Sequence, residues 1–304
     1  MARQRRVYGP VPSRRFGLSL GVDPLPRKTC CYDCVYCQQG RTTRLTCERA
    51  DLVPLDEILE DVREALASGP DPQVVTLAGS GEPTLYLSLE DLVLELRRIA
   101  RKPVVLLTNG ALLSDPAVRR AAALADVVSP DLDAADEETF RRVNRPHPAI
   151  SFDRMVEGLR ALREETTLAY DLEVFLARGV NDSADHVERL ADLARSIRAD
   201  SIRLNTAVRP VPRREGLALD PEEMERIAPL FGPTAGIVAS FTPGCDRRPG
   251  ASRDIMGVLE RRPCTADDLA SSLGIAVEEA VLILEGLERA GIVERAERGY
   301  WRVR

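Results

Sequence analysis

Short apolar runs alternate with longer amphipathic stretches along most of the chain. The apolar runs occupy residues 18–22, 74–77, 104–107, 126–128, 172–176 and 202–204, and helical periodicity occupies residues 89–99, 116–124, 136–143, 152–162 and 185–198. Strands that alternate with helices in this way are typical of βαβ units, in which the strands are parallel. We therefore expect an α/β fold.

Two architectures agree with this alternation. Right-handed crossovers between βαβ units curl a parallel sheet into a barrel or part of one, here a partial (β/α)6 barrel of the TIM type. A doubly wound open sheet agrees with the periodicity almost as well, and the periodicity does not separate the two. The length of 304 residues allows such a domain together with a small second one.

The pattern changes near residues 242–252, where the sequence TPGCDRRPGAS is rich in glycine, proline and polar residues. We expect a barrel domain over residues 1–245, a linker over 246–252 and a small domain over 253–304. The last part shows three helical patterns and two short strands, at residues 255–259, 265–274, 277–287, 292–293 and 300–303. The second of these helices begins at a sequence typical of a capping box. This order of elements resembles a winged-helix module.

Composition argues against a disordered, a membrane-spanning or a secreted protein. A hydrophobic content of 44% excludes disorder for the chain as a whole. No apolar run approaches the roughly 18 residues that span a bilayer, and the start MARQRRVYGPVPSRR lacks the apolar stretch of a secretory signal. We therefore expect a soluble cytoplasmic protein. Thiols stay reduced in that compartment, so a cysteine cluster indicates metal binding or catalysis rather than disulfides.

Four of the seven cysteines fall within eight residues, at Cys30, Cys31, Cys34 and Cys37. The spacing is C-x3-C-x2-C when it is counted from Cys30, and C-x2-C-x2-C when it is counted from Cys31. The second spacing is that of a ferredoxin, but a ferredoxin has a fourth cysteine where this chain has Arg41.

The number of ligands separates the possible metals. A closed structural zinc site needs four sulfur or nitrogen ligands, and a zinc loop completed by Cys47 is the less favoured alternative. Three thiolates on a short loop suit three irons of a [4Fe–4S] cluster. The fourth iron then has no protein ligand and is open to a small molecule.

The spacing C-x3-C-x2-C, with Tyr36 just before its last cysteine, resembles the radical S-adenosylmethionine (SAM) superfamily. The surrounding YGPVPSRRFGLSLGVD and CCYDCVYCQQGRT are similar to a branch of uncharacterised Fe–S oxidoreductases near the wybutosine-synthesis enzymes, which modify tRNA. The resemblance implies that Cys30, Cys34 and Cys37 ligate a [4Fe–4S] cluster, that SAM chelates the fourth iron, and that Tyr36 packs against the adenine. Cys31 departs from the pattern and competes with Cys30 as first ligand.

The resemblance continues at three expected strand ends, where the chemistry of parallel barrels collects. The segment Gly79-Ser80-Gly81-Glu82 is similar to the Gly-Gly-Glu segment of the family, which implies that Ser80, Gly81 and Glu82 bind the SAM amino group. Its glycines are expected to let the backbone approach a ligand. Asn109 lies in a similar Thr-Asn-Gly turn and would face SAM, and Asp131 stands where the family has a serine that touches the ribose.

Other residues are weaker candidates. Asn205 and Arg209 follow the last expected strand, so they are substrate-side candidates, although loop anchoring explains them equally well. We interpret Asp133 as structural and lone Cys245 as more often inert than catalytic. The sequence indicates no catalytic residue beyond the cofactor-binding set.

The net charge of −6 conceals an asymmetry. Residues 1–49 hold ten Lys or Arg against three Asp or Glu, a surplus of +7, so the remainder sums to −13. Basic pairs bracket the cysteine cluster, at Arg14 and Arg15, Arg27 and Lys28, and Arg41 and Arg44. Such a patch would hold a phosphate, a carboxylate or RNA, or would offset the charge of the cluster.

The last segment argues against sequence-specific DNA binding. A recognition helix needs Lys or Arg, yet residues 277–289 carry four glutamates against Arg289 alone. We expect a module that docks a protein, a peptide or a partner subunit. The expected wing carries three arginines, Arg295, Arg298 and Arg302, so nucleic acid stays open as an alternative ligand.

Two functions follow. The resemblance implies an enzyme in which an external electron donor, such as flavodoxin or ferredoxin, reduces the cluster. SAM is then cleaved to methionine and a 5′-deoxyadenosyl radical, which abstracts hydrogen from an unidentified RNA, protein, peptide or small molecule. The alternative is a cluster- or SAM-sensing regulator with a winged-helix output domain, against which the acidic helix counts.

Overall fold

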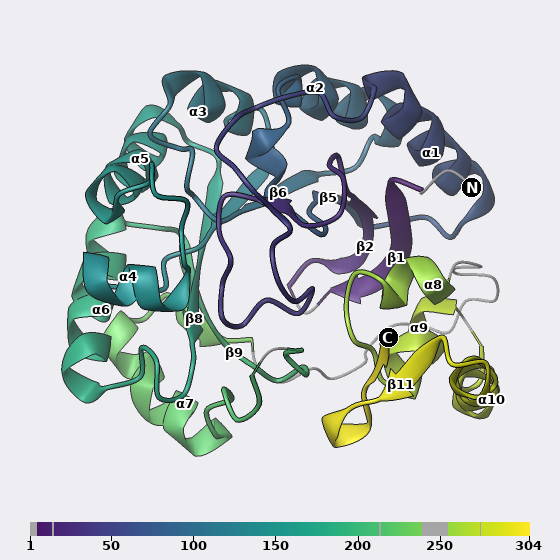
Figure 1. Ribbon diagram of the computed structural model, residues 1–304. Helices are drawn as coiled ribbons and strands as arrows, with labels where there is room; N and C mark the ends of the chain where they lie inside the picture. The colour runs from purple at the N-terminus through teal and green to yellow at the C-terminus, as the bar shows by residue number, and fades with distance from the viewer. Residues whose placement is uncertain (1–4, 14, 213, 239–254, 274) are drawn as a thin grey trace.

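The structure is a computed structural model that describes residues 5–13, 15–212, 214–238, 255–273 and 275–304 (Figure 1). Within these ranges eight strands form one curved sheet, in the order β1-β2-β5-β6-β7-β8-β9-β10. β1 is antiparallel to β2, and the later neighbours are parallel. The strands are β1 (Val7–Ser13), β2 (Gly17–Val22), β5 (Val74–Leu77), β6 (Val104–Thr108), β7 (Val127–Pro130), β8 (Ala169–Leu176), β9 (Ser201–Thr206) and β10 (Ala235–Ile237).

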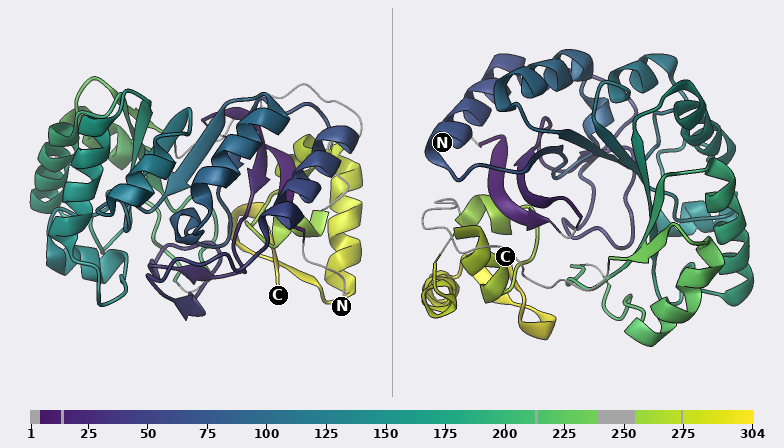
Figure 2. Two further views of the ribbon diagram at one scale, coloured as in Figure 1. Left: turned by 90° about the horizontal axis from the view of Figure 1, so that it is seen from above. Right: turned by 180° about the vertical axis from the view of Figure 1, so that it is seen from behind.

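Helices cover the outer, convex face of the sheet, and long loops fill its inner side (Figures 1 and 2). The apolar positions of the second helix recur at helical spacing, and Leu89, Leu92, Val93 and Leu96 are fully buried. The helices are α1 (Leu55–Ser68), α2 (Leu89–Ala100), α3 (Pro116–Ala122), α4 (Glu137–Val143), α5 (Phe152–Glu165), α6 (Ala184–Ile197) and α7 (Pro221–Ile227), with short 3-10 turns η1 (Pro83–Leu85) and η2 (Ala228–Phe231).

The strand order confirms the partial barrel. From β2 to β10 each parallel strand lies beside the next one in sequence, whereas a doubly wound sheet reverses its order. All six expected strands and all five expected helices of this part are found. The structure adds β10, α1, α7, the antiparallel strand β1, and a separate two-stranded sheet of β3 (Thr29–Cys30) and β4 (Arg44–Leu45) at the cysteine loop. Two prolines in β1 hid it from the apolar pattern, and an edge strand tolerates proline because its outer side makes no ladder bonds.

The segment after residue 254 contains the expected helices and hairpin. They are α8 (Ile255–Leu259), α9 (Ala266–Leu273), α10 (Val277–Arg289), β11 (Val293–Arg295), the 3-10 turn η3 (Glu297–Gly299) and β12 (Trp301–Val303). Thr265 Oγ1 accepts from Asp268 N and Asp268 Oδ2 accepts from Thr265 N, so the capping box is present. The winged-helix assignment and the domain boundaries remain predictions, and the expected linker at 246–252 lies outside the described residues.

This C-terminal segment packs against the first strand of the sheet (Figure 2). Its core contains Val258, Leu269, Leu284 and Trp301, and the same cluster includes Val11 of β1. The segment therefore lies along the open edge of the partial barrel. In the part of the chain that the structure describes, no helix combines the length and apolarity needed to cross a membrane.

The pairing of β1 with β2 gives a stability prediction. Gly21 lies opposite Tyr8, and a Cβ on Gly21 would come within 2.1 Å of the Tyr8 ring. We expect Gly21→Ala to lower the free energy of unfolding by about 1–3 kcal/mol, because the ring has to move. Urea denaturation of the metal-free protein measures this change.

Gly286 of α10 is the matched control, because nothing lies within 4 Å of a Cβ added there. Gly286→Ala should raise the free energy of unfolding by about 0.5–1 kcal/mol, since glycine is unfavourable within a helix. A Gly21→Ala protein as stable as the unmodified protein would contradict the packing described here.

Candidate functional site

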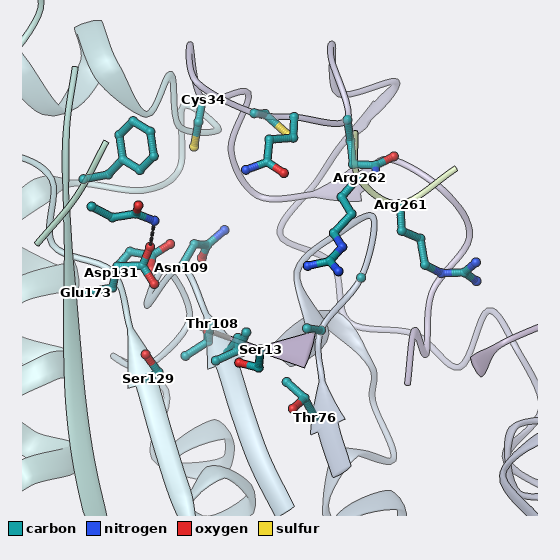
Figure 3. A pocket seen from close by; sticks show the side chains of 18 of the residues that line it. Ser13, Cys34, Thr76, Thr108, Asn109, Ser129, Asp131, Glu173, Arg261 and Arg262 are labelled. Atoms are coloured by element: carbon teal, nitrogen blue, oxygen red, sulfur yellow. Dashed lines mark hydrogen bonds between the residues drawn. The ribbon is translucent and has the colours of Figure 1, made fainter. Parts of the chain in front are cut away.

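A cavity of about 410 Å³ lies at the carboxyl ends of the parallel strands (Figure 3). Successive strands each contribute polar side chains: Glu82 follows β5, Asn109 follows β6, Asp131 follows β7, and Glu173 and Asn205 lie in β8 and β9. Because parallel strands end at the same edge of the sheet, these side chains meet although they are far apart in sequence.

The cysteine loop covers this edge. Cys30, Cys34 and Cys37 line the cavity, whereas Cys31 is fully buried in the hydrophobic core and hydrogen-bonds to Cys47. This hydrogen bond, followed by burial, raises the pKa of Cys31 well above its ordinary value. The arrangement favours the spacing counted from Cys30.

Each of the three cavity sulfurs has a nitrogen donor beside it. Lys28 Nζ lies 3.0 Å from Cys37 Sγ, Asn109 Nδ2 lies 3.5 Å from Cys30 Sγ, and Asn144 Nδ2 lies 3.7 Å from Cys34 Sγ. The backbone N of Tyr32 adds a second donor at 3.4 Å from Cys30 Sγ. Hydrogen bonds to ligating sulfurs stabilise their negative charge and tune the potential of an iron–sulfur cluster.

The chemistry of the sulfurs also agrees with a cluster. Burial raises the pKa of Cys30 to about 12 and raises that of Cys34 well above its ordinary value, so a bound cation is needed to form the thiolates. Among the described residues no three Cys, His, Asp or Glu side chains converge as ligands of a single ion. Three thiolates that each bind a different iron need not converge. The residues present therefore fit a [4Fe–4S] cluster.

Glu82 connects the ends of β5 and β6. Its Oε1 accepts from Thr84 N, Thr84 Oγ1 and Thr108 Oγ1, and its Oε2 accepts from Asn109 N at 2.8 Å. Burial raises the pKa of Glu82, while these donors lower it. Among the described residues Oε2 has one donor, so it keeps room for another, and Glu82 lines the cavity.

The glycines beside Glu82 line the cavity and also pack closely against the chain itself. A Cβ on Gly81 would lie 2.0 Å from Thr29 O, and one on Gly79 would lie 2.2 Å from Asp23 Cγ. The close neighbours are thus the cysteine loop and β2–α1 region of the chain itself. Ser80 also contacts this region of the chain. Its N and Oγ both donate to Asp23 Oδ2, and Ser80 is not among the residues that line the cavity.

Asp131 and Glu173 lie side by side on the cavity wall, with Arg15 beside them (Figure 3 shows the two carboxylates). Arg15 Nη1 lies 2.7 Å from Glu173 Oε2, and Asn205 Nδ2 donates to Glu173 Oε1 at 2.8 Å. Burial and then the charge of Glu173 raise the pKa of Asp131 well above its ordinary value. Glu173 escaped the sequence analysis. A charged residue within the apolar run LEVFL was the available signal.

Tyr36 forms another part of the wall. Its ring stacks on Phe175 with 3.9 Å between centroids, and its hydroxyl donates to Asp133 Oδ2. Asp133 also accepts from Asn144 Nδ2 and Phe175 N. Burial raises the pKa of Asp133 to about 6. Asp133 thus has the contacts of a structural acceptor, while Asp136 caps α4.

The two weaker substrate-side candidates reach the same cavity. Asn205 and Arg209 both line it and are 7% exposed. Cys245 lies outside the described residues. Arg261 and Arg262 also line the cavity. No sequence pattern predicted them, because they follow α8 in the C-terminal segment.

Solved structures share this fold. A radical SAM methyltransferase from Sphaerobacter thermophilus matches with a TM-score of 0.54 and 19% identity, over 74% of this chain and 67% of that one. Streptococcus suis SuiB bound to S-adenosylmethionine matches with a TM-score of 0.50 and 16% identity, over 70% of this chain and 43% of that one. At these identities the likeness concerns the fold alone.

Sequence relatives extend the comparison. A Brachyspira hyodysenteriae protein named GTPase Obg is 36% identical over 96% of this chain, which spans 44% of that protein, and this chain contains no Gly-Lys-Ser or Gly-Lys-Thr of a phosphate-binding P-loop. A UPF0026 protein of Methanocaldococcus jannaschii is 34% identical over 67% of this chain, which spans 64% of that protein. One from Helicobacter pylori is 30% identical over 86% of each chain.

The model of the radical SAM superfamily matches residues 26–194, which contain the cysteine loop and the strand ends up to β8. That range is more than half of the chain. The UPF0026 relatives agree with the uncharacterised branch that the sequence resembles. The chain therefore belongs to the radical SAM superfamily, the enzyme family that its cysteine spacing predicted and whose cofactors are a [4Fe–4S] cluster and SAM.

Proposed function

We propose that this chain is a radical SAM enzyme whose cluster is held by Cys30, Cys34 and Cys37. The observation that carries the proposal is that these three sulfurs, and not Cys31, open into one cavity with the polar ends of five parallel strands. When bound, the reduced cluster and SAM together supply reductive cleavage of SAM to methionine and the hydrogen-abstracting 5′-deoxyadenosyl group.

The residues around the cavity have the chemistry to hold SAM. The free position on Glu82 Oε2 accepts an N–H of the amino group. Asn109 is held by its own bonds to Glu82 and Ala111 and faces the same space. Asp131, beside Glu173, offers oxygens to the ribose hydroxyls, and Tyr36 offers the ring face not covered by Phe175 to the adenine.

In this proposal Ser80 does not contact SAM but positions the residues that do. Its two bonds to Asp23 fix the turn that carries Gly81 and Glu82. The backbone of Lys28 donates to Ser80 O, and Glu82 N donates to Thr29 O, so the same turn also fixes the cysteine loop. The amino-group site and the cluster site are thereby held at a constant separation.

The exposed basic residues near the cluster suit an acidic electron donor. Arg27, Arg41 and Arg44 are exposed on the segments that flank the cysteine loop. Charge complementarity speeds the docking of a negatively charged partner, such as flavodoxin or ferredoxin. A regulator with a DNA-binding output gains no comparable support, because α10 presents four glutamates and Arg289.

The cysteine assignment gives a direct test. We expect Cys30→Ala, Cys34→Ala and Cys37→Ala to lose the cluster absorbance after anaerobic reconstitution, because each removes one of three iron ligands. With SAM and dithionite, the unmodified protein should form 5′-deoxyadenosine, measured by chromatography, and these variants should form none.

Cys31→Ala is the matched control, because Cys31 faces the core and not the cavity. It should retain cluster and cleavage. Loss of the cluster in Cys31→Ala with retention in Cys30→Ala would show that the wrong first ligand has been chosen. If the unmodified protein carries a full complement of cluster and still forms no 5′-deoxyadenosine, the proposed enzyme activity is refuted.

Two carboxylates predict graded effects on SAM binding. Glu82→Gln should raise the Kd for SAM roughly 10- to 100-fold, because a hydrogen bond from an ammonium to a buried carboxylate is replaced by one to a neutral amide. Asp131→Asn should raise it less than about 10-fold, since an amide oxygen still accepts from a hydroxyl. Calorimetric titration of the reconstituted protein measures both values. Equal effects of the two substitutions would contradict the assigned contacts.

Lys28 predicts a shift in potential. Its ammonium lies 3.0 Å from Cys37 Sγ, and a cation there favours the more negative, reduced cluster. Lys28→Met should lower the reduction potential of the cluster by tens of millivolts. For a one-electron couple, roughly 59 mV corresponds to a tenfold change in the equilibrium constant. Redox titration followed by electron paramagnetic resonance measures it. The exposed neighbour Arg27 is the control, and Arg27→Met should shift the potential less because solvent screens its charge.

A further inference from the structure

One side of the cavity comes from outside the barrel. Arg261 and Arg262, in the turn that follows α8, line the same cavity as the three cysteines. Figure 3 shows that the two side chains diverge: Arg262 points into the cavity above Ser13 and Thr76, and Arg261 points away from it. The two arginines therefore have different tasks.

Arg261 fastens the C-terminal segment to the sheet. Its Nη1 donates to Gly257 O at 2.9 Å and its Nη2 donates to Arg5 O at 2.7 Å. Its guanidinium lies over the Tyr8 ring, 4.9 Å from the centroid, and its Nε lies 3.7 Å from Asp23 Oδ2. These contacts with the β1–β2 pair, all at the end where Val7 lies opposite Val22, account for its burial.

Arg262 has a fixed backbone and an unused side chain. Its N donates to Val258 O at 3.1 Å, and Pro263 after it restricts its backbone to extended conformations. Its Nε and Nη2 are buried and have no hydrogen-bond partner among the described residues. Burying guanidinium N–H groups without acceptors destabilises the folded protein. These N–H groups therefore indicate that a bound ligand supplies the missing acceptor.

The charges around the cavity indicate what that partner is. The carboxylates Asp131 and Glu173 lie on the opposite wall (Figure 3). Arg15 forms an ion pair with Glu173 there. On the side of Arg262 the acid Asp23 is already bound by Ser80 and lies next to Arg261. Arg209, which is 7% exposed, adds a second cation to the lining. The wall next to the C-terminal segment thus has positive charge, and no acid among the described residues pairs with Arg262.

We propose that Arg262 binds an oxyanion, a carboxylate or a phosphate, on the substrate of this enzyme. The inference rests on the proposed function, in which Glu82, Asn109 and Asp131 hold SAM, so the anion at Arg262 is assigned to the second reactant. The planar fork of the guanidinium pairs with two oxygens of one such group. The C-terminal segment then contributes a substrate-binding side chain to the barrel, in addition to any docking role.

The binding test uses the metal-free protein and two simple probes, inorganic phosphate and succinate. Trp301 is the only tryptophan of the chain, and Cys264, two residues after Arg262, exchanges two backbone hydrogen bonds with it at 3.0 and 2.8 Å. We expect saturable changes in Trp301 fluorescence and in the calorimetric signal. Tighter binding of phosphate would identify a phosphate group on the substrate, and tighter binding of succinate a carboxylate.

Arg262→Gln should weaken the preferred probe at least 10-fold, because a charge-assisted pair of hydrogen bonds is lost. Arg262→Lys keeps the charge but lacks the planar fork, so its affinity for the probe should lie between those of the unmodified protein and Arg262→Gln. Arg289→Gln is the matched control, since Arg289 is exposed on α10, and it should bind as the unmodified protein does. Equal affinities in all four proteins, or no binding of either probe to the unmodified protein, would overturn the proposal.

A second readout separates this inference from the proposed function. Reconstituted Arg262→Gln, given SAM and dithionite without substrate, should still form 5′-deoxyadenosine at the rate of the unmodified protein. Absence of cleavage in both proteins, with anion binding still dependent on Arg262, would refute the radical enzyme and leave the anion site standing. Cleavage lost in Arg262→Gln alone, with the cluster loaded, would show that Arg262 serves SAM and would overturn the substrate assignment.

Discussion

The burial of acidic groups at the carboxyl edge of the sheet is the constraint around which this region is arranged. Glu82, Asp131 and Asp133 lie there together with three thiols, and removing such groups from water is costly unless donors or cations compensate. Four donors bind Glu82, and a tyrosine, an asparagine and a backbone N–H bind Asp133. The loops take the paths that they do because they supply these partners.

The same compensation joins parts of the chain that are distant in sequence. Asn144, at the end of α4, reaches both Cys34 and Asp133, and Asn109 reaches both Glu82 and Cys30 through its backbone and side chain. Each asparagine therefore connects a sulfur with a carboxylate of the strand ends. A loop of eight residues cannot fix three sulfurs by itself, and these amides supply the missing restraint.

The sequence predicted the sheet better than it predicted the site. Apolar runs such as β5 and β6 are buried on both faces, so they stand out in any reading of hydrophobicity. The choice between Cys30 and Cys31 has no such signal, because adjacent residues in a loop follow no periodicity. The family resemblance indicated Glu82, Asn109, Asp131 and Gly81, which line the cavity, yet it did not show that Ser80 contacts Asp23 rather than the cavity. Arg262 reaches the cavity only through tertiary packing.

The packing of β1 against the C-terminal segment also bears on how the protein is made. Tyr8 and Val11 of β1 belong to one hydrophobic cluster with residues more than two hundred positions later, and Arg261 adds a bond to Arg5 O. Domains generally fold in the order in which the ribosome releases them. Here β1 leaves the ribosome before the rest of the sheet, and one apolar face of β1 stays uncovered until α8 and α9 emerge, so the barrel edge is completed only after the last strand of the sheet has been made.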